Sequence, residues 1–118
     1  SQGVVDLPSG LVLLSGQVAW DLEGKVRGAT VAEQTKHALE SLTAVLASAG
    51  CTPANVLSVR VYLRGEVSDH LAACVPLLAA YFGPTRPALT GIGVASLASK
   101  DTLIEIECVA RVPGAGSR

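Results

Sequence analysis

Two segments of the chain alternate apolar and polar side chains with the two-residue period of a β-strand that is buried on one face. Residues 57–63 place Arg60 on the polar face, and residues 103–112 place Glu105 and Glu107 there, among β-branched apolar neighbours. We therefore predict that each strand turns its apolar face to the core and its polar face to water, a cleft or a partner subunit. The positions predicted to face the core are Leu57, Val59, Val61, Leu63, Ile104 and Ile106.

Shorter apolar runs predict two further strands. Residues 11–18 are nearly continuously apolar, which is typical of a buried strand, and Gly16 within them indicates a close approach of another part of the chain. Residues 89–94 form the other strand, directly after a proline-containing segment. The stretch from residue 21 to residue 28 is polar and is predicted to be a loop.

A helix is predicted between Thr30 and Gly50. Thr30 and Glu33 have the T-x-x-E spacing of a capping box, and apolar residues follow at intervals of three and four. Gly50 stands where a glycine commonly ends a helix, because glycine adopts the left-handed conformation without strain.

A second helix is predicted over residues 68–82, capped by Ser68 or Asp69 and ended by glycine and proline. Pro76 lies inside this segment. An interior proline removes one backbone hydrogen bond and clashes with the carbonyl four residues earlier, at a cost of ~3 kcal/mol or more. We therefore expect a kink at Pro76, or a helix that begins near it.

In chain order these elements predict an α+β fold, with two helices on one face of a mixed sheet. We expect a single domain over residues 1–112 and a flexible tail over residues 113–118, which are rich in turn-forming residues. The chain of 118 residues is 49% hydrophobic but only 3% aromatic, so the core must be aliphatic. A surplus of aliphatic surface on so small a domain favours burial between subunits.

Charge and cysteine content narrow the function classes. The net charge is −1 and the Lys and Arg residues form no basic run, so we expect no nucleic-acid partner. The apolar runs end well before the ~18 residues that a membrane span needs, so no membrane partner is expected. Three cysteines without metal-ligand spacing, and no secretory signal pattern before the first strand, predict a cytoplasmic protein with free, buried thiols and no bound metal.

Few residues carry candidate chemistry. Glu105 and Glu107 have two readings: solvated or interface residues that pair with a cation such as Arg60, or carboxylates that position a water or a ligand amine in a cleft. His37 and His70 have no partner at metal-ligand spacing. The sequence contains no nucleophile elbow, P-loop or dinucleotide-binding glycine motif, so no cofactor is expected.

Several segments, in order and at matching spacing, resemble the Rid family, also called YjgF-like. No single segment is diagnostic, but the set is specific and covers nearly the whole chain. The segments are Ser15-Gly16-Gln17, Glu33-Gln34-Thr35, Val45-Leu46-Ala47-Ser48-Ala49-Gly50, Val59-Arg60-Val61-Tyr62-Leu63, Tyr81-Phe82-Gly83, Arg86-Pro87-Ala88 and Ile104-Glu105-Ile106-Glu107.

This resemblance implies a chorismate-mutase-like (YjgF-like) fold and a homotrimer whose three sheets form a central β-barrel. Ligand clefts would lie between neighbouring subunits, and the first glutamate of the last strand, here Glu105, would line each cleft. In the best-known branch, such proteins are deaminases that hydrolyse reactive 2-imino acids to 2-keto acids and ammonia. An arginine after a Pro-Ala pair binds the substrate carboxylate, and the glutamate orients the attacking water.

The chain departs from that branch because Leu89 follows Pro87-Ala88, where the resemblance implies an arginine. Val75 and Gly91 also stand where related proteins often carry asparagine and cysteine. We therefore predict a cleft that keeps its shape and binds or hydrolyses a different small metabolite, with Glu105 as the catalytic residue. The predicted ligand-contacting residues are Ser15, Gly16, Leu89, Thr90, Gly91 and Arg60.

Two other functions stay open. One is a genuine 2-iminobutanoate/2-iminopropanoate deaminase with a relocated cation, for which Arg86 and Arg60 are the candidates; strand alternation would point Arg86 away from Leu89. The other is a non-catalytic ligand sensor or partner-binding trimer, including relatives that are labelled endoribonucleases.

Overall fold

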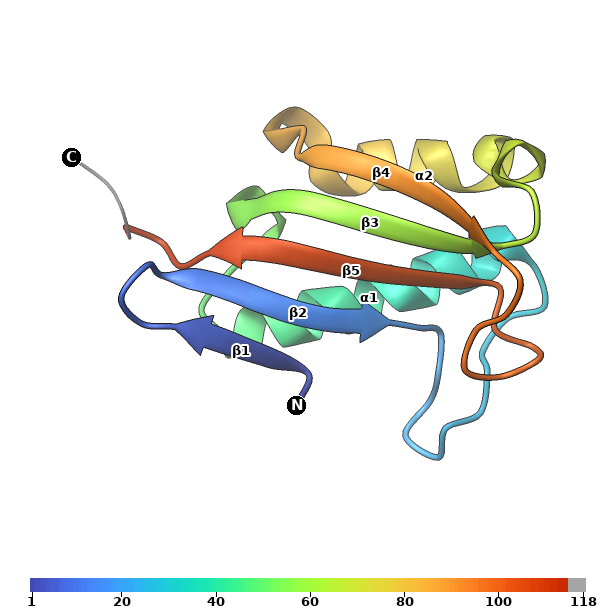
Figure 1. Ribbon diagram of the computed structural model, residues 1–118, viewed down its shortest axis with the longest axis horizontal. Helices are drawn as coiled ribbons and strands as arrows, with labels where there is room; N and C mark the ends of the chain where they lie inside the picture. The colour runs from blue at the N-terminus through green and yellow to red at the C-terminus, as the bar shows by residue number, and fades with distance from the viewer. Residues whose placement is uncertain (115–118) are drawn as a thin grey trace.

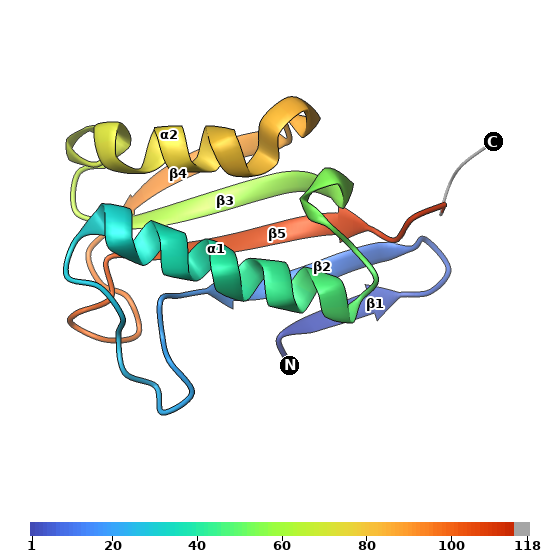
Figure 2. The ribbon, with the colours of Figure 1, turned by 180° about the vertical axis from the view of Figure 1, so that it is seen from behind.

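The computed structural model describes residues 1–114, which form a five-stranded mixed sheet covered on one face by two helices (Figures 1 and 2). This confirms the predicted α+β architecture. The sheet order is β1-β2-β5-β3-β4, and every neighbouring pair is antiparallel except β3 and β4. The elements are β1 (Gly3–Asp6), β2 (Leu11–Gln17), α1 (Val31–Ser48), β3 (Val56–Arg64), α2 (Leu71–Phe82), β4 (Ala88–Val94) and β5 (Ile104–Arg111).

Helix α1 begins and ends as predicted. The Thr30 hydroxyl accepts the backbone N–H of Glu33 at 3.2 Å. The Glu33 carboxylate accepts the backbone N–H of Ala29 at 3.4 Å, so it satisfies the donor one residue before the cap. Gly50 follows the helix with φ of 74°, the left-handed conformation that favours glycine.

Helix α2 starts differently from the prediction. Its N-cap is His70, with no side-chain cap, because Ser68 and Asp69 belong to a separate 3₁₀ turn, Val67–Asp69. The His70 ring instead contacts the backbone oxygen of Arg64 at 2.9 Å. The helix is continuous through Pro76, so the alternative that it begins near this proline is wrong.

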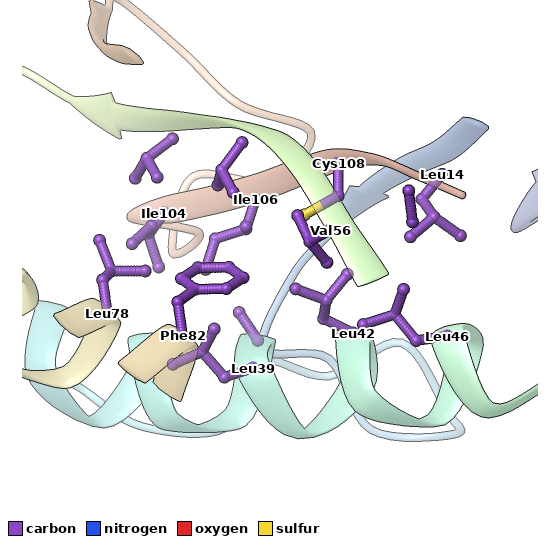
Figure 3. Packing of buried hydrophobic residues seen from close by; sticks show 14 of the residues in the cluster. Leu14, Leu39, Leu42, Leu46, Val56, Leu78, Phe82, Ile104, Ile106 and Cys108 are labelled. Atoms are coloured by element: carbon purple, nitrogen blue, oxygen red, sulfur yellow. The ribbon is translucent and has the colours of Figure 1, made fainter. Parts of the chain in front are cut away.

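The core lies between the sheet and the helices and is almost entirely aliphatic (Figure 3). Leu42 and Leu46 of α1, and Ile104 and Ile106 of β5, have no exposed surface. The three cysteines are free and buried, as predicted. Leu57 corrects one prediction: pairing of β3 with β5 shifts between Val56 and Ser58, so Val56 packs in the core and Leu57 remains 44% exposed.

Strand β1 was not predicted, because all four of its residues are exposed and leave no alternating pattern. In the predicted tail, Pro113 and Gly114 form a turn, whereas residues 115–118 lie outside the described residues. Within residues 1–114, no helix is both long and apolar enough to cross a membrane.

Candidate functional site

A bulge in β2 shapes the surroundings of Glu105. Leu14 pairs with Cys108 and Gln17 pairs with Ile106, so Ser15 and Gly16 together oppose a single residue of β5. The extra residue bends the strand locally and leaves backbone groups unpaired. The Ser15 N–H is satisfied from outside the pair, because it donates to the Gln2 backbone oxygen at 2.9 Å.

The Glu105 side chain packs directly against the backbone of Gly16. A Cβ atom at position 16 would stand 2.4 Å from Cδ of Glu105 and 2.5 Å from its Oε2. Non-bonded carbon atoms normally stay about 3.5–4.0 Å apart. Only glycine therefore leaves room for the carboxylate in this position, which accounts for the close approach predicted at Gly16.

The Glu105 carboxylate lines a hollow of about 400 Å³ at the end of β2. Gln17 closes one side: its side-chain amide donates to Gln2 Oε1 at 2.9 Å and to the Ser15 oxygen at 3.1 Å. We call this space the Glu105 hollow, and its lining residues include Gln2, Ser15, Gly16, Gln17, Ser41 and Glu105.

The electrostatic setting distinguishes the two glutamates of β5. Burial, and next the negative charge of Glu107, raise the pKa of Glu105 above its ordinary value. Glu107 has partners: it accepts a hydrogen bond from the Tyr62 hydroxyl and lies 3.5 Å from Arg60 Nη1. Within residues 1–114, no ion pair engages Glu105. The reading as a residue paired with a cation thus fits Glu107, whereas the Glu105 carboxylate has no ion-pair partner among these residues.

The Tyr62–Glu107–Arg60 cluster lies on the sheet face that the helices leave open. Arg60 pairs in register with Glu107, and Tyr62 pairs with Glu105. The hydrogen bond to Glu107 raises the pKa of Tyr62, which keeps its proton on the phenol oxygen. Arg60 is therefore engaged by Glu107 in a cluster beside Glu105, and a ligand would have to compete for it.

A second hollow, of about 320 Å³, lies where α2 meets the start of β4. Leu89 is 49% exposed there and Val75 is 48% exposed. Arg86 lines the same space, although strand alternation predicted the face opposite Leu89. Arg86 precedes β4 and adopts a left-handed conformation with φ of 49°, so the alternation of strand side chains does not apply to this residue. This is the Leu89 hollow, lined by Val75, Leu78, Ala79, Phe82, Gly83, Arg86, Pro87 and Leu89.

The predicted site residues thus fall into separate groups within one chain. Leu89 and Gly91 pair with Val59 and Val61 and share the helix-covered face, whereas Thr90 pairs with Arg60 on the open face. Strands β2 and β4 are three strand spacings apart, which is about 14 Å at ~4.8 Å per spacing. The two hollows therefore lie beside different strands of a single chain.

Sequence reasoning missed Gln2 and Gln17 as lining residues. Gln2 precedes a strand that the hydrophobic pattern did not reveal. Gln17 is only 5% exposed, and its one signal was a polar residue in an apolar run. Within the described part of the chain, no group of three or more His, Cys, Asp and Glu side chains is placed to hold a metal ion.

Comparisons with known proteins cover most of the chain. The family described as Endoribonuclease L-PSP matches residues 1–112. A RutC family protein of Pyrococcus abyssi is 35% identical over 100 residues, which make up 84% of this chain and 76% of that protein. The 2-iminobutanoate/2-iminopropanoate deaminase of Rattus norvegicus is 34% identical over 100 residues, or 84% of this chain and 71% of the deaminase. The crystal structure of YyfA, a conserved Rid family protein of Yersinia pestis, is similar with a TM-score of 0.85 at 27% identity, over 95% of this chain and 86% of that one.

Proposed function

This chain belongs to the endoribonuclease L-PSP family, as its Rid-like motifs indicated, and we propose that it hydrolyses a small imine in clefts between the subunits of a homotrimer. The observation that carries this proposal is the Glu105 carboxylate, held against Gly16 at the edge of a hollow with both polar and apolar lining residues. A relative of this chain in Rattus norvegicus is named 2-iminobutanoate/2-iminopropanoate deaminase, which supports the same chemistry.

The separation of the two hollows supports a cleft between copies. The Glu105 hollow lies beside β2 and the Leu89 hollow beside β4, at opposite sides of the sheet order. A neighbouring copy that brings its β4 side to the β2 side of the first would join them into one cleft. Exposed aliphatic side chains such as Leu13, at 51%, and Leu89, at 49%, give such an interface apolar surface to bury. A closed trimer with a central barrel is the form of this association that we propose.

Glu105 would act as the general base. It takes a proton from a water molecule while the water oxygen forms a bond to the imine carbon, and the imine nitrogen takes up a proton. The hydroxyl proton of the resulting aminoalcohol then passes to the amine nitrogen, and the carbon–nitrogen bond breaks to release ammonia while the carbon–oxygen double bond forms. One water is consumed, and one carbonyl compound and one ammonia are produced. A raised pKa makes the ionised Glu105 a stronger base than an ordinary carboxylate.

The family's description names an endoribonuclease, but the charges of this chain favour a small-molecule ligand. Nine Lys and Arg residues are outnumbered by ten Asp and Glu residues. Binding an RNA backbone depends on neutralising phosphates with clustered cations.

The three buried thiols fit the cytoplasmic location that we expect, since reducing compartments keep thiols free.

The test is release of ammonia and keto acid from 2-iminopropionate, generated in the assay by an amino-acid oxidase. We expect the wild-type protein to accelerate release and Glu105→Gln to lose at least a hundredfold in rate while keeping its mass in solution. Glu107→Gln is the matched control, because Glu107 lies on the same strand face but is held by Tyr62 and Arg60. Equal activity of wild type and Glu105→Gln would refute the proposal, and so would a wild-type protein that does not accelerate release.

A further inference from the structure

Trp20, the only tryptophan of the chain, lines the Glu105 hollow and is held there by the segment that leads into β5. Its indole N–H donates to the Thr102 hydroxyl at 2.9 Å. Thr102 has no exposed surface, and its hydroxyl lies 2.6 Å from the hydroxyl of Ser99. Arg64 fixes the same segment, because its guanidinium donates to the backbone oxygens of Thr102 at 3.0 Å and of Ser99 at 2.6 Å. The indole is therefore held by a connected set of hydrogen bonds.

The loop that carries Trp20 is fixed from its own side as well. Trp20 forms an isolated antiparallel bridge with Val26. Between these two residues, the Asp21 carboxylate accepts the backbone N–H groups of Glu23 at 2.9 Å and of Lys25 at 2.8 Å. The turn thus stabilises itself, and it keeps the indole of Trp20 at the wall of the Glu105 hollow.

The lining of the hollow determines which ligand charge fits it. An indole has one hydrogen-bond donor and no acceptor. Thr102 takes that donor, so Trp20 offers the hollow only hydrocarbon and π surface. Asp21 and Glu105 are the charged lining residues, and the lining contributed by residues 1–114 includes no Lys, Arg or His. Aromatic faces and carboxylates both attract cations, so the lining favours a small organic cation over an anion.

We propose that Trp20 is a specificity-determining residue of this site, and that the charged nitrogen of a small protonated imine or amine contacts its indole and the Glu105 carboxylate. The inference rests on the proposed function in taking the Glu105 hollow as the place of hydrolysis, and it adds the charge of the group that binds there. A carboxylate beside the imine nitrogen favours the protonated imine, whose carbon is more readily attacked by water. In return, the cation favours the ionised form of Glu105, which is the form that acts as a base.

The test is calorimetric titration at neutral pH with three probes of similar shape that are not turned over: isobutylammonium, isobutanol and isobutyrate. We expect isobutylammonium to bind at least about tenfold more tightly than isobutanol, and isobutyrate to bind more weakly than either, because the hollow attracts positive charge. The fluorescence of Trp20 should change as isobutylammonium binds. Since the chain has no other tryptophan, this signal reports on the Glu105 hollow.

Variants at both contact residues separate the two contributions. Trp20→Leu should lose about fivefold or more in affinity for isobutylammonium, whereas Trp20→Phe should keep most of it, because phenylalanine retains a π face. Both variants leave the Thr102 hydroxyl its partner Ser99. Glu105→Gln should bind isobutylammonium no more tightly than isobutanol. Tyr81→Leu removes an aromatic side chain of α2 outside the hollow, so it is the matched control and should bind as wild type does.

Three results would overturn the inference. They are equal wild-type affinities for isobutylammonium and isobutanol, unchanged Trp20 fluorescence at saturation, and a Trp20→Leu variant that binds isobutylammonium as wild type does. An unchanged thermal midpoint shows that a variant is folded, and the first two results need no variant. Because no probe is hydrolysed, failure here is distinct from failure of the imine hydrolysis. Glu105-dependent hydrolysis without a preference for isobutylammonium would keep the proposed function and reject this inference.

Discussion

Replacing Gly16 by alanine tests whether activity requires the Glu105 carboxylate to pack against the β2 bulge. The added Cβ would lie 2.4 Å from Glu105 Cδ, so the carboxylate has to move by about 1 Å to restore contact distances. The atoms that collide belong to the end of a flexible side chain, and moving it off its rotamer costs about 0.5–1.5 kcal/mol. Gly16 does not have a positive φ, so alanine also reduces the entropy of the unfolded chain, which is worth about 0.4–1 kcal/mol.

We therefore expect the free energy of unfolding of Gly16→Ala to stay within about 1 kcal/mol of wild type, because the two terms oppose each other. The rate of imine hydrolysis should fall on the order of a hundredfold, since a base misplaced by 1 Å loses about that factor. Urea denaturation and the ammonia-release assay measure the two quantities on the same preparation.

The control is the same substitution in a Glu105→Ala background, where the colliding atoms are gone. There Gly16→Ala should stabilise the protein, and the difference between the two backgrounds measures the clash. The reasoning fails if Gly16→Ala keeps full activity, because hydrolysis would then not depend on the position of the Glu105 carboxylate against Gly16. A loss of more than about 3 kcal/mol would also refute it, because only a collision with rigid parts of the chain has that cost.

Five further outcomes are expected. Thr30→Ala should lower the unfolding free energy by about 1 kcal/mol, measured by urea denaturation, since it removes the cap of α1; an unchanged value would contradict the cap. Leu42→Ala, at a fully buried position, should lower it by about 2–5 kcal/mol, whereas Leu22→Ala, fully exposed, should leave it unchanged. Burial raises the pKa of Glu105, so hydrolysis should fall off on acidification at a pH above the ordinary value of 4.5. The same shift means that ionised Glu105 lowers stability at neutral pH and not below pH 4.5, so Glu105→Gln should stabilise the protein only at the higher pH. Burial raises the pKa of Cys108 to about 12, so this thiol should resist iodoacetamide at pH 8 in the folded protein and react once it is unfolded.

The hydrophobic pattern predicted those elements that bury one face. Helix α1 and strand β5 were predicted because burial of their apolar residues imposes periods of 3.6 and 2 on the sequence. Strand β1 buries no residue and thus left no pattern. Leu57 was predicted to face the core because the sequence alternates through it. The register shift between Val56 and Ser58 turns Leu57 outward, and the sequence pattern does not reveal such a shift.

The candidate site was predictable in composition and not in arrangement. The acidic residues of β5 identified Glu105. Gly16 was noticeable because it interrupts an apolar run. The contact of the Glu105 side chain with the Gly16 backbone depends on the pairing of β2 with β5, which is a long-range property. Strand alternation did not apply to Arg86, because this residue precedes β4 and has a left-handed backbone that strand periodicity does not encode.

The strand at the centre of the sheet is the last one to be synthesised. β5 pairs with β2 on one side and with β3 on the other, although both precede it in the chain. During translation β2 and β3 therefore emerge with unpaired edges, and such edges are templates for pairing between molecules. The five-stranded sheet can therefore form only after β5 has been made. A ribosome that stalls before Ile104 leaves two waiting edges, each able to accept the β5 strand of another copy.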